Sequence, residues 1–446
     1  MSSRRDLAYE KFVVDHVAKI GKEQEDSLAS IQSLSQNSTQ PIVEVGVADL
    51  SFYQIHHLSK REREEQNFPI TENYQSDVLD KLENVAQSVN EILLNHNYLE
   101  GDSLFVTSKY DEKICPRLKS LKKLVLHNND FSSANFLGSL SGVPLEEIVL
   151  SHNNLVSFVV LNQTLINLSL DYNRLSTFTI CSHDNIQELD LSHNKLTTFS
   201  IMHDLLDQRL PSLRILKLIG NELTGALSSQ SQSLRQLEEL HLDQNHLTHI
   251  GDDLINNLTN LRHFSASYNQ LDSSPNIFDS KFTKLSTVLL NNNKIHQLPN
   301  HVNGSPPIQT LMLNNNELEW IPEWINQLAP TLVDITLQSN KLTTLPKTFG
   351  ELTLLTTLYL FKNELTHLPD EICNLINLTE FDVFENKLKK LPDNIGNFTK
   401  LSRLCVDDND LTTIPNSLMN CDQLYLFSYQ GNNNLRVPAF LSKMHK

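Results

Sequence analysis

The sequence predicts an α/β solenoid, a horseshoe of about 14 short repeats whose parallel strands form a sheet on the concave face. Three observations lead to this prediction. One phrase, LxxLxLxxNxL, recurs from residue 121 onward, with Ile, Val, Phe or Ala replacing some leucines. Its spacing is mostly about 23 or 24 residues, a period typical of solenoids. Within each copy, apolar and polar residues alternate as in a short strand with one buried face.

The phrase itself explains why the copies must stack. One LxL strand cannot cover its own apolar face, so neighbouring copies share a continuous core. The asparagine after each strand carries an amide that can donate and accept hydrogen bonds. It can therefore satisfy backbone groups that the turn would otherwise bury unpaired. We predict a structural asparagine ladder with these members: Asn129, Asn153, Asn173, Asn194, Asn221, Asn245, Asn269, Asn293, Asn316, Asn340, Asn363, Asn386, Asn409 and Asn432.

The later repeats carry a second phrase after the asparagine. It reads "HQLPN", "TTLPKTF" or "THLPDEI", and it is absent before Asn293. Proline fixes φ where the chain leaves the strand, just ahead of a helical turn. We therefore expect the convex side to change character near residue 295.

The two ends of the chain differ from the repeats. Residues 1–100 are interpreted as a small helical N-terminal region and cap, 101–120 as a transition, 121–434 as the repeats and 435–446 as a C-terminal cap. Residues 76–99 carry apolar residues at 78, 79, 82, 85, 89, 92 and 93, which form a helical stripe. The end of this stretch, "VNEILLNHNYL", also fits the repeat phrase, but its asparagine lies far ahead of Asn129, and we favour the helix.

Charge and composition exclude several classes of function. The net charge of -17 disfavours nucleic-acid binding and permits a protein partner with a basic surface. No apolar run of about eighteen residues exists, so no membrane insertion is expected, and the N-terminus lacks a secretory core. The cysteines are scattered, which fits a reducing compartment and a cytoplasmic location. They are Cys115, Cys181, Cys373, Cys405 and Cys421.

No motif for a nucleophile, a phosphate or a metal is found, so the chain is predicted to be non-enzymatic and free of cofactors. His241, His246 and His249 lie close in the sequence, with His263 in the next repeat. A metal site needs converging ligands, and these histidines are expected on different faces of the repeat. Cys405 is interpreted as an ordinary surface thiol on the concave face.

Strand alternation also predicts a candidate binding surface. In "LTEFDVFENKL", Phe381 points into the core, whereas Asp382 and Phe384 point towards the concave face. Equivalent positions on adjacent strands lie about 4.8 Å apart, so Phe361 and Phe384 should be neighbours, with Tyr359 two residues from Phe361 along the same strand. Most other repeats have a polar residue in the slot of these two phenylalanines.

Outward aromatic residues are frequent binding hot spots. The predicted partner-binding residues are Tyr359, Phe361, Phe384 and Met312 as apolar anchors, with Asp382, Glu385, Asp407 and Asp408 as a solvated acidic patch that steers a basic partner. The alternative is that the rings only pack on one another. A weaker second candidate is the N-terminal concave rim, with Tyr172, Tyr268 and His193.

The phrases "LEELHLDQNHL", "LTTLYLFKNEL" and their relatives resemble the leucine-rich-repeat family over residues 121–446. The Leu-Pro repeats are similar to those of Ras-binding and scaffold proteins, and to those of effectors that intracellular bacteria deliver into host cells. The resemblance implies a protein-interaction module, with a bacterial effector as one setting. The competing hypothesis attaches substrate-receptor repeats to an active or ligase-recruiting region in residues 1–100. The oligomeric state is not predicted.

Overall fold

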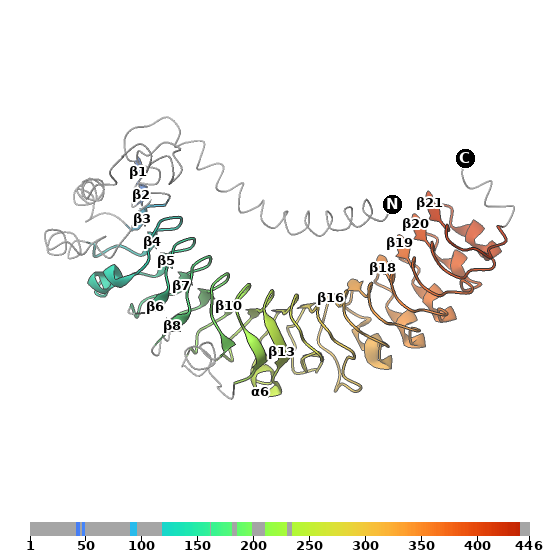
Figure 1. Ribbon diagram of the computed structural model, residues 1–446, viewed down its shortest axis with the longest axis horizontal. Coiled ribbons are helices and arrows are strands. Elements are labelled where there is room, and N and C mark those ends of the chain that lie inside the picture. Colours follow the sequence, from blue (N-terminus) through green and yellow to red (C-terminus); the bar gives the residue numbers. More distant parts are fainter. Residues whose placement is uncertain are drawn as a thin grey trace.

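The computed structural model describes residues 42–44, 47–49, 90–95, 118–160, 162–180, 185–198, 210–229 and 234–437. These residues form a curved solenoid (Figure 1). The strands of its long sheet line the inside of the arc, and helices such as α6 (Asp252–Ile255) lie on the outside. The fold class predicted from the repeats is confirmed.

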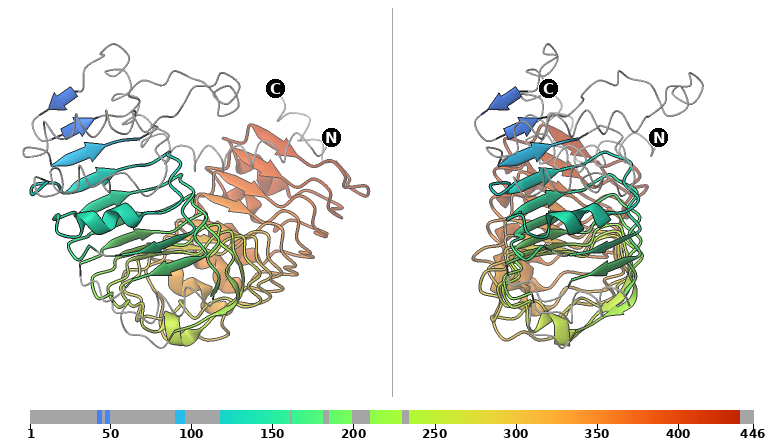
Figure 2. Two further views of the ribbon diagram at one scale, coloured as in Figure 1. Left: turned by 60° about the vertical axis from the view of Figure 1, so that its left-hand side comes forward. Right: turned by 90° about the vertical axis from the view of Figure 1, so that its left-hand side faces the viewer.

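One sheet of 17 strands runs through the described repeats, and its strands lie side by side in a single layer (Figure 2). β1 and β2 pair antiparallel, and every later strand pairs parallel with its neighbour. The strands are β1 (Ile42–Glu44), β2 (Val47–Asp49), β3 (Glu91–Leu93), β4 (Lys123–Val125), β5 (Glu147–Val149), β7 (Asn167–Ser169), β9 (Glu188–Asp190), β10 (Ile215–Lys217), β12 (Glu239–His241), β14 (His263–Ser265), β15 (Thr287–Leu289), β16 (Thr310–Met312), β17 (Asp334–Thr336), β18 (Thr357–Tyr359), β19 (Glu380–Asp382), β20 (Arg403–Cys405) and β21 (Leu426–Ser428).

The convex side changes along the chain, as the Leu-Pro phrase predicts. In the earlier repeats it contains two short parallel pairs, β6 (Ser157–Val159) with β8 (Thr177–Thr179) and β11 (Thr224–Leu227) with β13 (His246–Ile250). The later repeats carry 3-10 helices instead of strands, most of them with a proline at the N-cap position. The earlier repeats also contain a 3-10 helix, at Asn135–Leu140, and the short helix α6. In the part of the chain that the structure describes, the 3-10 helices are η2 (Asn135–Leu140), η4 (Glu323–Leu328), η5 (Lys347–Glu351), η6 (Asp370–Asn374), η7 (Ile395–Asn397) and η8 (Asn416–Asn420).

The core is one continuous apolar cluster between the two sides. The middle residue of each concave strand from β3 to β21 points into it. Leu358, Phe381 and Leu404, for example, are fully buried and pair in register across β18, β19 and β20. Because each repeat contributes only a thin layer, every strand depends on both neighbours to exclude water.

The asparagines after the strands form hydrogen bonds with the backbone of the preceding repeat. In a typical step, the Asn293 side-chain amide donates to the carbonyls of Ala266 (2.9 Å) and Leu290 (3.1 Å). Its oxygen accepts from the backbone N–H of Leu271 (3.0 Å). All fourteen predicted members are buried, with at most 9% of each exposed. The ladder therefore ties each repeat to the one before it through buried backbone groups.

The helix predicted over residues 76–99 is wrong at its C-terminal end. Residues 91–93 form β3, which pairs in parallel with β4, and Ile92 and Leu94 are fully buried. The Asn129 amide donates to the Leu94 carbonyl (2.9 Å), so this segment acts as a repeat. The open edge of β4 offers unpaired backbone groups and uncovered core, which outweighs a local helical period.

The N-terminal region is not wholly helical, because residues 42–44 and 47–49 are also strands. The other helices predicted within residues 1–100, and the cap beyond residue 437, lie outside the described residues. In the part of the chain that the structure describes, no helix is long and apolar enough to cross a membrane.

Candidate functional site

Three rings, Tyr359, Phe361 and Phe384, meet on the concave face and are called here the aromatic cluster. The Phe361 and Phe384 rings stack with centroids 4.6 Å apart and planes 9° apart. Tyr359 lies 6.4 Å from Phe361, tilted by 57°. The neighbours predicted from strand alternation are therefore neighbours in the fold. All three side chains are half-buried.

The cluster is held by its own strands. Tyr359 ends β18 and its hydroxyl donates to Glu380 Oε2 (2.8 Å) on β19. The backbone N–H of Lys362 donates to the Phe384 carbonyl (3.0 Å), which fixes the two phenylalanines in register. Stacking covers part of each ring, and the half-buried state leaves apolar area open on the concave side.

Met312 is not part of the aromatic cluster. It is half-buried on β16, and Thr336 on β17 stands between it and Tyr359. The Thr336 hydroxyl contacts the Met312 sulfur (3.2 Å) and donates to Asn314 Oδ1 (2.9 Å). Strand β17 therefore separates Met312, a predicted anchor, from the aromatic cluster.

Two of the four predicted steering carboxylates are not solvated. Asp382 and Asp407 are buried, at 3% and 4% exposed. Asp382 accepts from the backbone N–H of Phe384 (3.3 Å), and Asp407 accepts from Ser428 Oγ (2.5 Å) and Gln430 N (2.7 Å). These carboxylates hold the turns after their strands. Buried backbone donors need such acceptors, which the expectation of a solvated patch overlooked.

The other two predicted carboxylates do face solvent. Glu385 and Asp408 are exposed on the rim, each in the left-handed conformation (φ 51° and 49°). Sequence reasoning missed Arg403, which lies 3.6 Å from Asp382 and 3.8 Å from Glu380. Strand alternation in "LSRLCV" places Arg403 on the concave face, so the sequence could have indicated this residue. This guanidinium partly balances the local negative charge.

Cys405 is not a surface thiol. It is 5% exposed, and burial together with the nearby charge of Asp382 raises its thiol pKa. Ser265 and Thr336, at the same position in other strands, are also buried. Cys373 and Cys421 are buried free thiols whose pKa values burial raises to about 12 and about 11.

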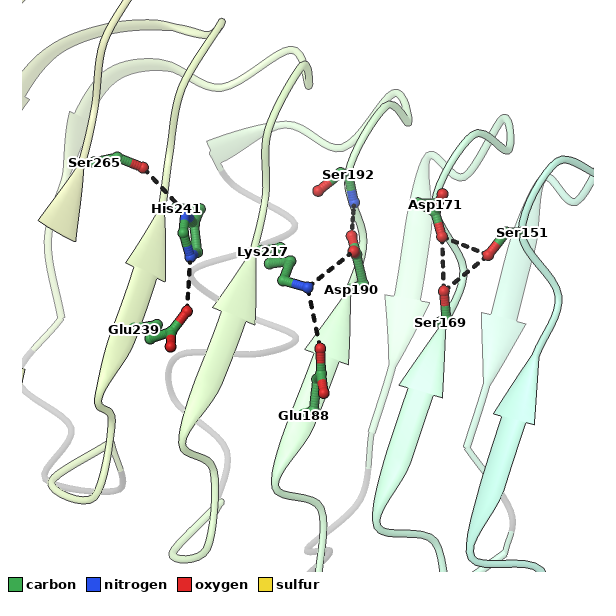
Figure 3. Close-up of polar contacts among 10 residues, drawn as sticks. All are labelled: Ser151, Ser169, Asp171, Glu188, Asp190, Ser192, Lys217, Glu239, His241 and Ser265. Atoms are coloured by element: carbon green, nitrogen blue, oxygen red, sulfur yellow. Dashed lines mark hydrogen bonds and ion pairs between the residues drawn. The ribbon is translucent and has the colours of Figure 1, made fainter. Parts of the chain in front are cut away.

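Polar side chains fill the concave face of the earlier repeats (Figure 3). Lys217 Nζ lies 3.0 Å from Glu188 and 3.7 Å from Asp190. Burial raises the pKa of Asp190 despite the hydrogen bond that the Ser192 backbone N–H donates to it (3.0 Å). The cation and the carboxylates satisfy one another within the sheet.

One contact chain in this region has the order of a nucleophile, a base and an acid. Ser265 Oγ lies 3.2 Å from His241 Nδ1, and His241 Nε2 lies 3.2 Å from Glu239 Oε2 (Figure 3). Ser265 is 1% exposed, and its hydroxyl donates to the Asp243 carboxylate. A nucleophile must reach a substrate and yield its proton to the base. The arrangement does not support catalysis.

The histidines occupy different faces, as predicted. His241 and His263 stack on the concave side with centroids 4.6 Å apart, whereas His246 and His249 belong to β13 on the convex side. Burial and the neighbouring His241 lower the pKa of His263 to about 4. Among the residues that the structure describes, no group of three His, Cys, Asp or Glu side chains converges.

The N-terminal rim holds a second ring stack. Tyr172 lies between His152 (4.3 Å, 8°) and His193 (4.1 Å, 19°). Tyr268 lies several repeats away and is 54% exposed. The fold thus joins two of the three predicted rim residues. His152 could have been found because it also precedes a ladder asparagine.

The fold and the ladder define a repeat scaffold of parallel strands. The Leucine Rich Repeat family model matches residues 185–205. Chicken lumican is 28% identical over 232 residues, which are 49% of this chain and 61% of lumican. Rat lumican is 29% identical over 51% of this chain and 58% of its own length. The chain thus spans about three fifths of the lumicans that it matches.

Solved structures agree with the fold. A leucine-rich-repeat protein of Leptospira interrogans superimposes with a TM-score of 0.64 at 27% identity, covering 89% of this chain and 93% of that one. YopM, a leucine-rich effector protein from Yersinia pestis, gives 0.56 at 20% identity, covering 84% and 96%. The chain therefore has the parallel-sheet fold of a leucine-rich-repeat solenoid.

Proposed function

We propose that this protein binds another protein on its concave face, with the aromatic cluster as the apolar anchor. Leucine-rich repeats typically serve as protein-interaction scaffolds. The observation that carries the proposal is the Phe361–Phe384 stack on a face that is mostly polar elsewhere. The corresponding residues of the other repeats are polar except for Ile219: His127, Ser151, Asp171, Ser192, Asp243, Ser267, Asn291, Asn314, Gln338, Asp407 and Gln430.

The energetics favour a binding role for such rings. An aromatic side chain buried by a partner often contributes about 2 kcal/mol or more. Apolar area on a soluble surface also carries a cost in solubility, so a contiguous cluster calls for a reason. Self-packing explains why the rings stack but not why aromatic residues replaced polar ones in two adjacent repeats.

Charge supports a partner with a basic surface. The concave strands and the turns after them carry more carboxylates than cations, and such a field steers an oppositely charged partner. The carboxylates are Glu91, Glu147, Asp171, Glu188, Asp190, Glu239, Asp243, Asp334, Glu380, Asp382, Glu385, Asp407 and Asp408; the cations are Lys123, Lys217, Lys362 and Arg403. The exposed members, Glu385 and Asp408 near the cluster, are the residues we expect to face the partner.

A pull-down from cell lysate with the full chain tests this proposal. The test variant is Tyr359→Ser, Phe361→Ser, Phe384→Ser, and the control is Tyr172→Ser, Tyr268→Ser, which removes exposed rings from the other candidate surface. We expect one protein to be lost from the test eluate alone. With that protein purified, the triple variant should bind at least about 30-fold more weakly, or about 2 kcal/mol.

An eluate that both variants share with the wild type would show that the rings only pack on one another. Loss in the control variant alone would move the site to the N-terminal rim. Circular dichroism of both variants confirms that the solenoid still folds.

As the setting, we propose a bacterial effector that acts in the reducing interior of a host cell. Support comes from the three described cysteines, which are all free, and from the likeness to the Leptospira protein and to the Yersinia effector fold. Thiol titration of the denatured protein, isolated from infected cells without reductant, should find five free thiols. Disulfides in that material would contradict the setting and leave the concave site untouched. The competing ligase-recruiting hypothesis concerns a region mostly outside the described residues.

A further inference from the structure

A hollow of about 480 Å³ opens on the convex side where the extended repeats give way to helical ones. Both tryptophans of the chain lie in it. Its lining consists of Asn300, His301, Val302, Trp320, Ile321, Pro322, Glu323, Trp324 and Gln327. The concave site described above is on the opposite side of the sheet.

The hollow follows from the change in repeat type. Residues 297–307 contain no helix, whereas the next repeat forms η4, so two unlike backbones face each other. Trp324 closes the inner wall: it is 7% exposed, its indole N–H donates to the Pro299 carbonyl (2.6 Å), and its ring packs on Phe278 (5.3 Å). The wall is therefore fixed by the core.

Trp320 lies on the outer side and is 39% exposed. In the other Leu-Pro repeats the same position, two residues before the proline, is polar: Gln297, Thr344, His367, Lys390 and Thr413. The repeat fold thus places no demand for an aromatic ring there. A half-open indole beside a hollow is a face on which a flat group can stack.

Glu323 supplies the charge. It is exposed at the start of η4, and one carboxylate oxygen accepts from Thr348 Oγ1 (2.9 Å). In the part of the chain that the structure describes, no ion pair involves Glu323; Lys347 pairs with Glu371 instead (3.2 Å), and the lining of the hollow contains no Lys or Arg. An indole face beside an unpaired carboxylate suits a cation, and a planar guanidinium can stack on the one while hydrogen-bonding to the other.

We propose that this hollow binds an arginine side chain presented by a basic peptide segment of a partner. The guanidinium lies against the Trp320 ring and pairs with the Glu323 carboxylate. Its charge complements a hollow whose only carboxylate is unpaired and a chain whose net charge is -17. This site does not rest on the concave interface, and each can fail without the other.

The test uses the full chain and the peptide acetyl-Gly-Arg-Gly-amide, with the citrulline analogue as its neutral isostere. Binding is read from tryptophan fluorescence and from saturation-transfer NMR of the peptide. We expect the arginine peptide to bind saturably and the citrulline peptide to bind at least tenfold more weakly, because only the first is charged.

Three variants assign the site. Trp320→Thr installs the residue found at the same position one repeat later, and Glu323→Gln keeps an acceptor for Thr348; both should weaken binding at least fivefold. Asp370→Asn removes a carboxylate from the equivalent position after Pro369 and should leave binding unchanged.

Equal binding of the two peptides, or no saturable binding, would overturn the proposal. So would a Glu323→Gln variant that behaves like Asp370→Asn. Binding that survives both hollow variants but is lost in the triple aromatic variant would place the arginine on the concave face and also overturn it.

Discussion

At the scale of single residues, two consecutive residues shape the turn after each strand: the ladder asparagine and the residue before it. The ladder asparagine satisfies the backbone, and the residue before it takes a left-handed conformation, with φ between 49° and 58° in the non-glycine cases. These residues are Asn128, His152, Tyr172, His193, Gln244, Tyr268, Asn292, Asn315, Ser339, Lys362, Glu385 and Asp408. Such a conformation costs roughly 1–2 kcal/mol per residue, which the buried hydrogen bonds of the asparagine offset.

Replacing a ladder asparagine should therefore be costly. Asn293→Ala leaves the Leu271 N–H and the Ala266 and Leu290 carbonyls without this partner, all of them buried in the turn. We expect a loss of about 3 kcal/mol in the free energy of unfolding, measured by denaturant titration. Asn374→Ala, at an exposed position in η6, should change stability by no more than about 0.5 kcal/mol.

The left-handed position gives a second prediction. At Tyr268 (φ 56°, 54% exposed), glycine removes the steric strain while little packing is lost, so Tyr268→Gly should be neutral or stabilise by up to about 1 kcal/mol. Tyr268→Val should destabilise by about 1–2 kcal/mol, because a β-branched side chain tolerates positive φ poorly. If denaturant titration places valine at or above glycine in stability, the turn is not strained.

His263 gives a pH dependence. Its pKa in the folded protein is about 4, below the value of 6.5 expected when unfolded, so the unfolded chain binds the proton first as the pH falls. The contribution of neutral His263 to the free energy of unfolding is fully present above about pH 6.5. It is lost as the pH falls towards 4, and the loss reaches up to about 3 kcal/mol.

The variant His263→Thr, which installs the residue found at this position on β15 and β16, should flatten the dependence of unfolding free energy on pH between 6.5 and 4. His249→Thr, at an exposed position, should keep the wild-type slope. An NMR titration that shows His263 protonating near pH 6.5 in the folded protein would contradict the assignment.

At the scale of elements, strand β3 shows how a neighbour decides a local structure. The helical stripe joins Ile92 with Leu93, whereas the strand buries Ile92 and Leu94 and turns Leu93 to the concave face. The same residues thus fit both a helical period and strand alternation. The edge of β4 selects the strand, because pairing there satisfies its backbone groups and covers Leu124.

This difference can be measured with two truncations. Leu94→Ala should lower the free energy of unfolding by about 2–5 kcal/mol, since Leu94 is fully buried in the shared core. Leu93→Ala should cost well under half of that, because Leu93 is only half-buried. The reverse order would restore the helix hypothesis for this segment.

At the scale of the whole molecule, charge is uneven and mostly negative. The net charge of the chain is -17, and carboxylates outnumber cations on the concave face. These carboxylates repel one another across the curved sheet. Ion pairs between repeats, such as Arg214–Glu238 (2.6 Å) and Lys341–Glu317 (2.6 Å), are exposed, and exposed pairs contribute little to stability. Long-range repulsion should therefore dominate the response to salt.

Raising NaCl from about 10 mM to about 150 mM shortens the Debye length from about 30 Å to about 8 Å. We expect the thermal unfolding midpoint to rise over this range, because screening weakens the repulsion more than it weakens the exposed pairs. The same series in a variant with Glu385→Gln and Asp408→Asn should show a smaller rise. A midpoint that falls with salt would mean that the ion pairs outweigh the repulsion.

The sequence by itself determined the features that depend on a repeated local pattern. The period, the parallel strands, the asparagine ladder and the change at the Leu-Pro repeats all follow from alternation and spacing, because every copy faces the same neighbours. For the same reason the pairing of Phe361 with Phe384 could be predicted from strand register alone.

Tertiary structure decided what depends on the surroundings of a single side chain. Alternation places Asp382, Asp407 and Cys405 on the concave side but does not say that all three are buried there, or that turn N–H groups donate to the two carboxylates. The hollow at Trp320 and the stack around Tyr172 arise between repeats of unlike sequence. Register sets the direction of a side chain, whereas burial and contact depend on the size and polarity of the residues that the fold brings against it.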